Sequence, residues 1–166
     1  KRSELTIMTP QGPHTIAVDL NRIKPLLYGA VVLAAFLLAA SASARWDVWL
    51  MARHAVPFGT SDPILGRDVS FYVFRLPLLK LVQSTLFMTV LLATIGVAVL
   101  HRAGQNLTFD PGRGILVSAT ARRHLSWLAA ALLLLMAFNA WLGVPELLTR
   151  PGGIVHGASY VDVYAR

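Results

Sequence analysis

Histidine and aspartate side chains in two polar segments have the chemistry needed for metal binding or proton transfer. They are His54, Asp62, Asp68, His156 and Asp162. Imidazole together with carboxylate suits zinc or manganese, and carboxylates alone suit calcium. Their spacing contains no H-x-x-x-H or comparable ligand pattern; Asp62 opens a turn before Pro63, and Asp68 is next to Arg67. We therefore expect no metal site, and the sequence does not identify a cofactor.

Other reactive patterns are absent from the sequence. The lack of cysteine excludes disulfides, thiolate metal sites and cysteine nucleophiles. G-x-S-x-G, P-loop and H-E-x-x-H patterns are missing too, so no catalytic residue is predicted. The enzymatic alternative is a lipid-modifying site at the outer membrane surface that uses His54, Asp62 or Asp68. Loss of a lipid species in Asp68→Ala would support it.

Three long apolar blocks separate these polar segments. They occupy residues 25–44, 81–100 and 125–144, and none contains a charged residue. At about 1.5 Å per residue, each block spans the roughly 30 Å hydrocarbon core of a bilayer. Hydrophobicity that is continuous rather than alternating indicates helices and not barrel strands. We therefore predict an all-α membrane fold with a bundle of three transmembrane helices.

Composition and charge agree with a membrane setting. Charged residues make up 14% of the chain, against about a quarter in soluble domains, and mean hydropathy is +0.60. The net charge of +7 comes from Lys and Arg that are scattered near the ends of the blocks. Such residues set orientation and contact anionic headgroups, so membrane lipids are the expected partners and nucleic acid is not. Other membrane-protein subunits are further candidate partners.

The blocks divide the chain into alternating inner and outer segments. Eight Lys and Arg fall on the side of the N-terminus, against seven on the other, which favours the N-terminus inside a bacterial cytoplasmic membrane. Residues 1–24 and 101–124 are then cytoplasmic, and turn signals between strand-like runs predict a short β-hairpin in each. Ser118 or Thr120 is expected to cap a lead-in to the third helix. Residues 45–80 form an ordered extracytoplasmic interfacial loop, and residues 145–166 form an extracytoplasmic tail.

Residues 45–80 hold the candidate interaction residues. Many aromatic side chains in water would form an exposed apolar patch, so we expect Phe71 and Phe74 to be mostly buried. Residues 71–75 are predicted to form a short interfacial helix, with an extended strand as the alternative. Asp68 is expected to pair with an arginine or to cap this helix. The candidate interaction residues of this loop are Phe58, Gly59, Asp62, Asp68, Phe71, Tyr72 and Phe74.

Small and polar residues inside the blocks are candidate helix contacts. Thr85, Thr89 and Ala93 repeat every four residues, and small side chains at this spacing let helices approach closely. Asn139, deep in the third block, is expected to bond a neighbouring helix. A proton or ion pathway normally contains an intramembrane acid or base, and these blocks have none.

Several motifs resemble a known family of large uncharacterised bacterial membrane proteins, UPF0182. The similar strings are PFGTSDPILGRDVSFYVFRLP at 57–77, ARRHL at 121–125, WL at 141–142 followed by PELL, and GASYVDV at 157–163. The resemblance covers about residue 25 to the end, whereas residues 1–20 show no clear match. The chain departs from the family pattern at Gly143, Val144 and Pro145, where the family has Asp, Arg and Tyr, which puts an ionic role there in doubt.

The resemblance implies that the chain is a piece of a longer polypeptide with about seven membrane helices and a large extracytoplasmic domain. It implies no catalytic residues. The leading hypothesis is a non-enzymatic membrane module that anchors or orients a larger envelope protein and contributes to envelope-directed transport. The alternative is an accessory helical subunit docked in a larger membrane complex.

Overall fold

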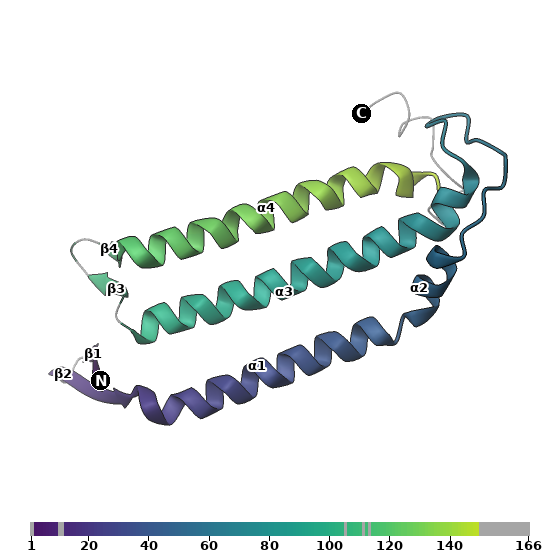
Figure 1. Ribbon diagram of the computed structural model, residues 1–166. Helices are drawn as coiled ribbons and strands as arrows, with labels where there is room; N and C mark the ends of the chain where they lie inside the picture. The colour runs from purple at the N-terminus through teal and green to yellow at the C-terminus, as the bar shows by residue number, and fades with distance from the viewer. Residues whose placement is uncertain (1, 10–11, 105, 111, 113, 150–166) are drawn as a thin grey trace. The chain divides into compact units, whose positions relative to one another are not determined.

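The fold consists of long helices joined by short hairpins and one irregular loop. The computed structural model describes residues 2–9, 12–104, 106–110, 112 and 114–149, with residues 2–9 and 12–24 described by their backbone alone. The elements in chain order are β1 (Arg2–Thr9), β2 (Gly12–Asp19), α1 (Leu20–Ser43), α2 (Trp46–Arg53), the π-helical turn η1 (Phe71–Arg75), α3 (Leu76–Ala103), β3 (Leu107–Asp110), β4 (Gly114–Val117) and α4 (Ala119–Leu147). All of them except η1 are labelled in Figure 1.

Three helical stretches in the described part of the chain are long and apolar enough to cross a membrane. They are Pro25–Ser43, Phe71–Ala103 and Ala119–Leu147. Each contains most of a predicted apolar block, and the last two extend beyond their blocks at both ends. These extensions include Lys80, Arg102 and Arg122, and long charged side chains of this kind favour helix. Pro77 and Pro145 lie in the same extensions, so helix propensity alone does not set the ends of the helices.

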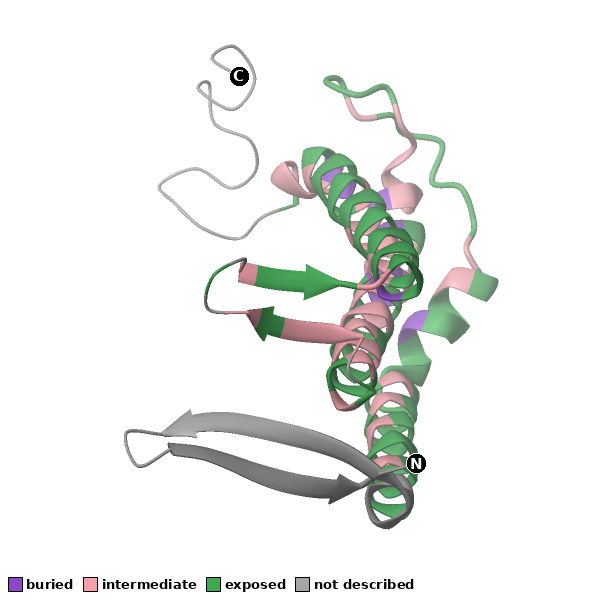
Figure 2. Ribbon diagram, turned by 90° about the vertical axis from the view of Figure 1, so that its left-hand side faces the viewer, coloured by how far each residue is buried: buried purple, intermediate pink, exposed green. Residues whose placement is uncertain are grey.

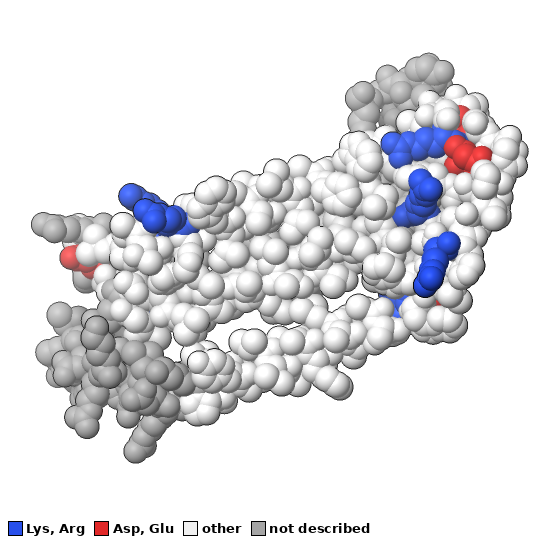
Figure 3. All heavy atoms as spheres, in the orientation of Figure 1, with Lys and Arg blue, Asp and Glu red and all other residues white. Residues whose placement is uncertain are grey.

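Most apolar side chains on these helices are exposed. The windows of highest hydropathy are between 0% and 6% buried within the chain. Leu26, Trp127 and Leu134 have exposed fractions of 74%, 73% and 71%. Figure 2 shows few buried stretches along the helices, which are drawn mostly in the colours of exposed and intermediate residues. On the face shown in Figure 3, the middle of each helix carries no charged side chain. Such a surface is far larger than the apolar patches of soluble proteins, so another apolar phase or partner must cover it.

Tertiary contacts divide the chain into two compact units. The first unit contains residues 1–39 and 89–131, and the second contains residues 40–88 and 132–166. Both hairpins belong to the first unit, and the irregular loop with α2 and η1 belongs to the second.

Two antiparallel hairpins confirm the strand predictions. In the first, Arg2 pairs with Asp19 and Thr9 with Gly12; in the second, β3 pairs with β4 from Leu107↔Val117 to Asp110↔Gly114. The second hairpin turns through Gly114, whose φ of +77° suits glycine.

The start of α4 is capped. The amide of Ala121 donates to Ser118 Oγ at 3.2 Å, which confirms Ser118 as the capping residue. The amide of Ser118 donates to the carbonyl of Asn106 at 2.9 Å and so closes the base of the second hairpin.

The segment before Pro77 is helical, as predicted, but it is not a separate helix. Turn η1 continues directly into α3, and the amide of Leu76 donates to the carbonyl of Phe71, five residues earlier. Pro77 has no N–H and its ring clashes with the carbonyl four residues before it. The wider π turn gives this ring room without ending the helix. Residues 46–53 and 76–80, which fall within the predicted loop, are also helical. The segment between α2 and η1 comprises residues 54–70, of which Val69 and Ser70 are already helical.

Candidate functional site

The carboxylate of Asp68 organises the irregular loop of the second unit. Asp68 Oδ1 accepts hydrogen bonds from the amides of Ser70 at 2.8 Å and Phe58 at 3.2 Å, and Oδ2 accepts one from the amide of Gly59 at 2.9 Å. Gly59 has a φ of +73°, which glycine adopts without strain. The amide of Val69 donates to the carbonyl of Thr60 at 2.9 Å. One carboxylate thus joins the two ends of the loop.

These donors also set the charge state of Asp68. Hydrogen bonds from the side chain and amide of Ser70, followed by those from the amides of Phe58 and Gly59, lower the pKa of Asp68 from 3.8 to about 2. The residue immediately precedes the helical segment, which confirms that it caps the helix. A carboxylate held ionised by several donors is a poor proton acceptor near neutral pH, so this geometry gives the enzymatic alternative no support.

Asp62 forms the turn at the tip of the loop. Its Oδ2 accepts hydrogen bonds from the amide of Leu65 at 2.6 Å and from the Tyr72 hydroxyl at 3.1 Å. Its carbonyl accepts one from the amide of Gly66 at 2.9 Å, and Gly66 has a φ of +66°. The bond to Tyr72 ties this turn to η1.

Aromatic contacts fix the loop on the helix end. Phe58 and Phe74 meet edge to face with ring centroids 5.6 Å apart, and Phe71 meets Tyr72 in the same way at 5.4 Å. Phe71 and Phe74 are half-buried rather than mostly buried, so the predicted contact is confirmed while the predicted extent of burial is not. Loop and helix together bring all seven candidate interaction residues into one region; their contact with a partner stays a prediction.

A small core connects this region to the end of α4. Tyr72, Leu76 and Leu142 are buried together, and the partly buried side chains packed against them are Phe71, Leu79, Phe138 and Leu148. The guanidinium of Arg67 lies 4.5 Å from the ring centroid of Phe71 and 5.5 Å from that of Trp141. Sequence reasoning did not anticipate this double cation–π contact, because Trp141 is far from Arg67 along the chain.

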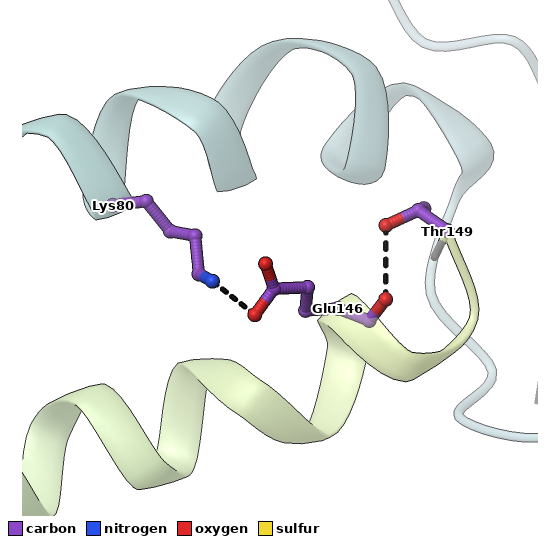
Figure 4. Close-up of polar contacts among 3 residues, drawn as sticks. All are labelled: Lys80, Glu146 and Thr149. Carbon is purple, nitrogen blue, oxygen red and sulfur yellow. Dashed lines mark hydrogen bonds and ion pairs between the residues drawn. The ribbon is translucent and has the colours of Figure 1, made fainter. Parts of the chain in front are cut away.

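An ion pair between Lys80 and Glu146 joins α3 to α4 in the same unit (Figure 4). Both side chains are about a third exposed, at 31% and 36%. The Thr149 hydroxyl donates to the carbonyl of Glu146 at 3.1 Å (Figure 4). Lys80 directly precedes the second apolar block, and Glu146 closely follows the third. Two opposite charges at the ends of neighbouring apolar helices were the sequence signal that could have identified the pair.

The polar residues on the helix faces have different surroundings. Gln83 is buried, and its side-chain amide donates to the carbonyl of Leu135 in α4 at 3.3 Å. The Thr85 hydroxyl donates to the carbonyl of Leu81 within its own helix at 2.8 Å. Thr89, Ala93 and Asn139 are exposed within the chain, so their predicted helix contacts stay predictions. Gln83 is the interhelical contact that the small-residue pattern missed.

An exposed hollow surrounds Asn139. It has a volume of about 420 Å³, and Gln83, Ser84, Phe87, Met88, Met136, Asn139 and Ala140 line it.

The part of the chain that the structure describes contains no group of three or more His, Asp or Glu arranged to hold a metal ion. His54 Nδ1 lies 2.9 Å from the carbonyl of Leu50 in its own helix. His156, Asp162 and the motif at 157–163 lie outside the described residues.

Comparison with known proteins identifies relatives but no structural precedent. The model of an uncharacterised protein family, UPF0182, matches residues 6–166. The match therefore begins within residues 1–20, where we had expected none. A UPF0182 protein of Synechococcus sp. is 41% identical over 128 residues, which cover 77% of this chain and 15% of the relative. The UPF0182 proteins of Pelobacter propionicus and Geobacter sulfurreducens are 35% and 38% identical over 87% of the chain and 16% of each relative. No solved structure matches.

The chain thus spans about one sixth of the length of these relatives. Its motifs, the family match over nearly all of its residues and the identities above 30% agree with one another. The chain belongs to the UPF0182 family.

Proposed function

We propose that this chain is a membrane-inserted module of a bacterial envelope protein, with α1, α3 and α4 crossing the cytoplasmic membrane. The observation that carries the proposal is that at most 6% of each apolar window is buried within the chain. Water would leave this surface exposed at a large free-energy cost, whereas hydrocarbon covers it and the helices satisfy their own backbone groups.

Within this proposal the module anchors and orients the remainder of a longer protein. The relatives are about six times longer than their match to this chain, which leaves most of their length to be positioned. The loop at 54–70 is the proposed contact surface, because Asp68 and Asp62 hold it in one conformation and the apolar side chains of Phe58, Ile64 and Leu65 remain exposed. A preordered loop loses little conformational entropy when it binds a partner.

Membrane extraction tests the insertion directly. The expressed chain should stay with the membrane pellet after alkaline carbonate treatment and should dissolve only in detergent. Replacing Leu133 and Leu134 with lysine puts two charges at the middle of α4, at a cost of about 2.5–3.5 kcal/mol each on insertion scales, and should shift the chain toward the soluble fraction. Replacing the two with alanine is the matched control. Release of the unmodified chain by carbonate would contradict the proposal.

A second candidate role is docking of a further membrane helix, as expected of an accessory helical subunit. Asn139 is exposed in the hollow described above, and an amide facing hydrocarbon lacks the hydrogen bonds that water would supply. A neighbouring helix with a polar side chain would satisfy this amide and fill the hollow. The relatives' additional length provides one source of such a helix, and a separate subunit provides the other.

A further inference from the structure

Two histidines face each other where α3 ends and α4 begins, within the first unit. His101 Nε2 lies 3.4 Å from His124 Nδ1, the ring centroids are 5.6 Å apart, and the ring planes are inclined at 53°. Sequence reasoning did not single out either residue, because 23 positions separate them.

The second hairpin holds the two histidines in place. The amide of Asn106 donates to the carbonyl of His101 at 2.9 Å, and the carbonyl of Asn106 accepts from Ser118 at 2.9 Å. Ser118 in turn caps α4, six residues before His124. Paired strands and backbone hydrogen bonds therefore connect the end of α3 to the start of α4. This connection holds the two rings near each other, so a ligand that binds both nitrogens loses little conformational entropy of the chain.

The separation of the nitrogens is long for a hydrogen bond, and it also fits two ligands of one metal ion. Hydrogen bonds from N–H groups are usually about 2.7–3.2 Å long, so 3.4 Å leaves a weak contact. Zinc binds imidazole nitrogen at about 2.0–2.1 Å, and a tetrahedral angle then places two such nitrogens about 3.3–3.4 Å apart. The observed spacing matches that edge of a tetrahedron.

We propose that His101 and His124 together bind one divalent transition-metal ion of the zinc, nickel or copper class. Neutral imidazole is a good ligand for these ions, and water completes the coordination. Magnesium and calcium prefer several carboxylate or carbonyl oxygens. Arg102, Arg122 and Arg123 lie within two residues of the histidines in the sequence. Their positive charge disfavours magnesium and calcium, which bind mainly through electrostatic attraction to oxygen ligands. The bound ion links α3 to α4.

Metal titration of the full chain tests this site, with the protein prepared without a polyhistidine tag and first treated with a chelator. Competition with a fluorescent zinc indicator should give one site per chain. Zinc and nickel should raise the thermal unfolding midpoint, and magnesium should not, because an ion that binds the folded state stabilises it. His101→Gln and His124→Gln should each weaken zinc binding by about tenfold or more. His54→Gln is the matched control and should bind as the unmodified chain does.

His101→Cys keeps a zinc ligand and should retain binding, which separates loss of a ligand from loss of folding. If a glutamine variant fails to fold, zinc binding by His101→Cys still tests the site. If both glutamine variants bound zinc as tightly as the unmodified chain, or if His54→Gln lost as much affinity as they do, the proposal would be overturned. The result is independent of membrane insertion, because the same detergent-solubilised chain is used throughout.

Discussion

A single side chain, Asp68, determines the conformation of the most elaborate part of the molecule. Its two oxygens accept amide hydrogen bonds from both ends of the loop, on Phe58, Gly59 and Ser70. Its neighbour Arg67 lies over aromatic rings. The composition of the segment indicated a cap or an ion pair at Asp68, but the contact with Phe58 and Gly59, ten and nine residues away, depends on tertiary folding.

Protonation of Asp68 should open this loop at low pH. Because the pKa is lowered from 3.8 to about 2 by folding, the stabilisation is fully present above about pH 4 and is lost as pH falls toward 2. Limited proteolysis with pepsin across this range, read by mass spectrometry, should show increasing cleavage within residues 54–70. Asp68→Asn should be cleaved readily at every pH, because an amide cannot accept with both of its terminal atoms.

Asp47→Asn in the first turn of α2 is the matched control and should behave as the unmodified chain does. Identical cleavage of Asp68→Asn and the unmodified chain at about pH 4, where pepsin is active and the Asp68 carboxylate of the unmodified chain is still ionised, would show that the carboxylate does not hold the loop.

At the scale of elements, polar contacts at defined positions connect helices whose surfaces are otherwise apolar. In the second unit, α3 and α4 are joined by the ion pair between Lys80 and Glu146, the bond from Gln83 and the core around Leu142. The positions of the three apolar helices and both hairpins were predictable, because hydropathy and turn residues act locally. The pairing of particular side chains was not, because it depends on the rotation of one helix against another.

The ion pair should stabilise the contact between α3 and α4 measurably. Glu146→Gln and Lys80→Gln should each lower the unfolding midpoint in detergent, and the double variant should lose less than the sum of the two. Exposed pairs in water have coupling free energies of about 0.2–1 kcal/mol, and reduced hydration near apolar surface should place this pair at the upper end. Additive losses in this double-mutant cycle would show that the pair contributes nothing.

The face around Asn139 should be the docking face for a further helix. A photo-crosslinking residue at 139 should give a cross-linked product in native membranes. The same residue at Trp127, which is 73% exposed and which we expect to face lipid, should not. Asn139→Leu should weaken the same association, because it removes the amide that a polar neighbour would bond. Equal cross-linking yields at the two positions would contradict a specific face. Mass spectrometry of the product separates a segment of the same polypeptide from a second subunit.

At the scale of the whole molecule, a feature could be predicted from the sequence when the residues that determine it are close together along the chain. The three apolar helices, the family and the two hairpins followed from patterns within a few tens of residues. Continuity of η1 with α3 did not, because Pro77 usually marks a boundary and the π turn that accommodates it has no local sequence signal. The facing of His101 and His124 depends on the hairpin between them.

The proposed membrane topology predicts on which side of the membrane each polar segment lies. With three crossings, residues 54–70 and the second hairpin must lie on opposite sides, and the slight excess of Lys and Arg predicts that the hairpin is inside. The chain has no native cysteine, so single substitutions report cleanly. In intact cells a membrane-impermeant maleimide should label Ser61→Cys and should label Thr108→Cys only after permeabilisation. Labelling of both from outside would remove the three-crossing arrangement, and the reverse pattern would keep the crossings but invert the orientation.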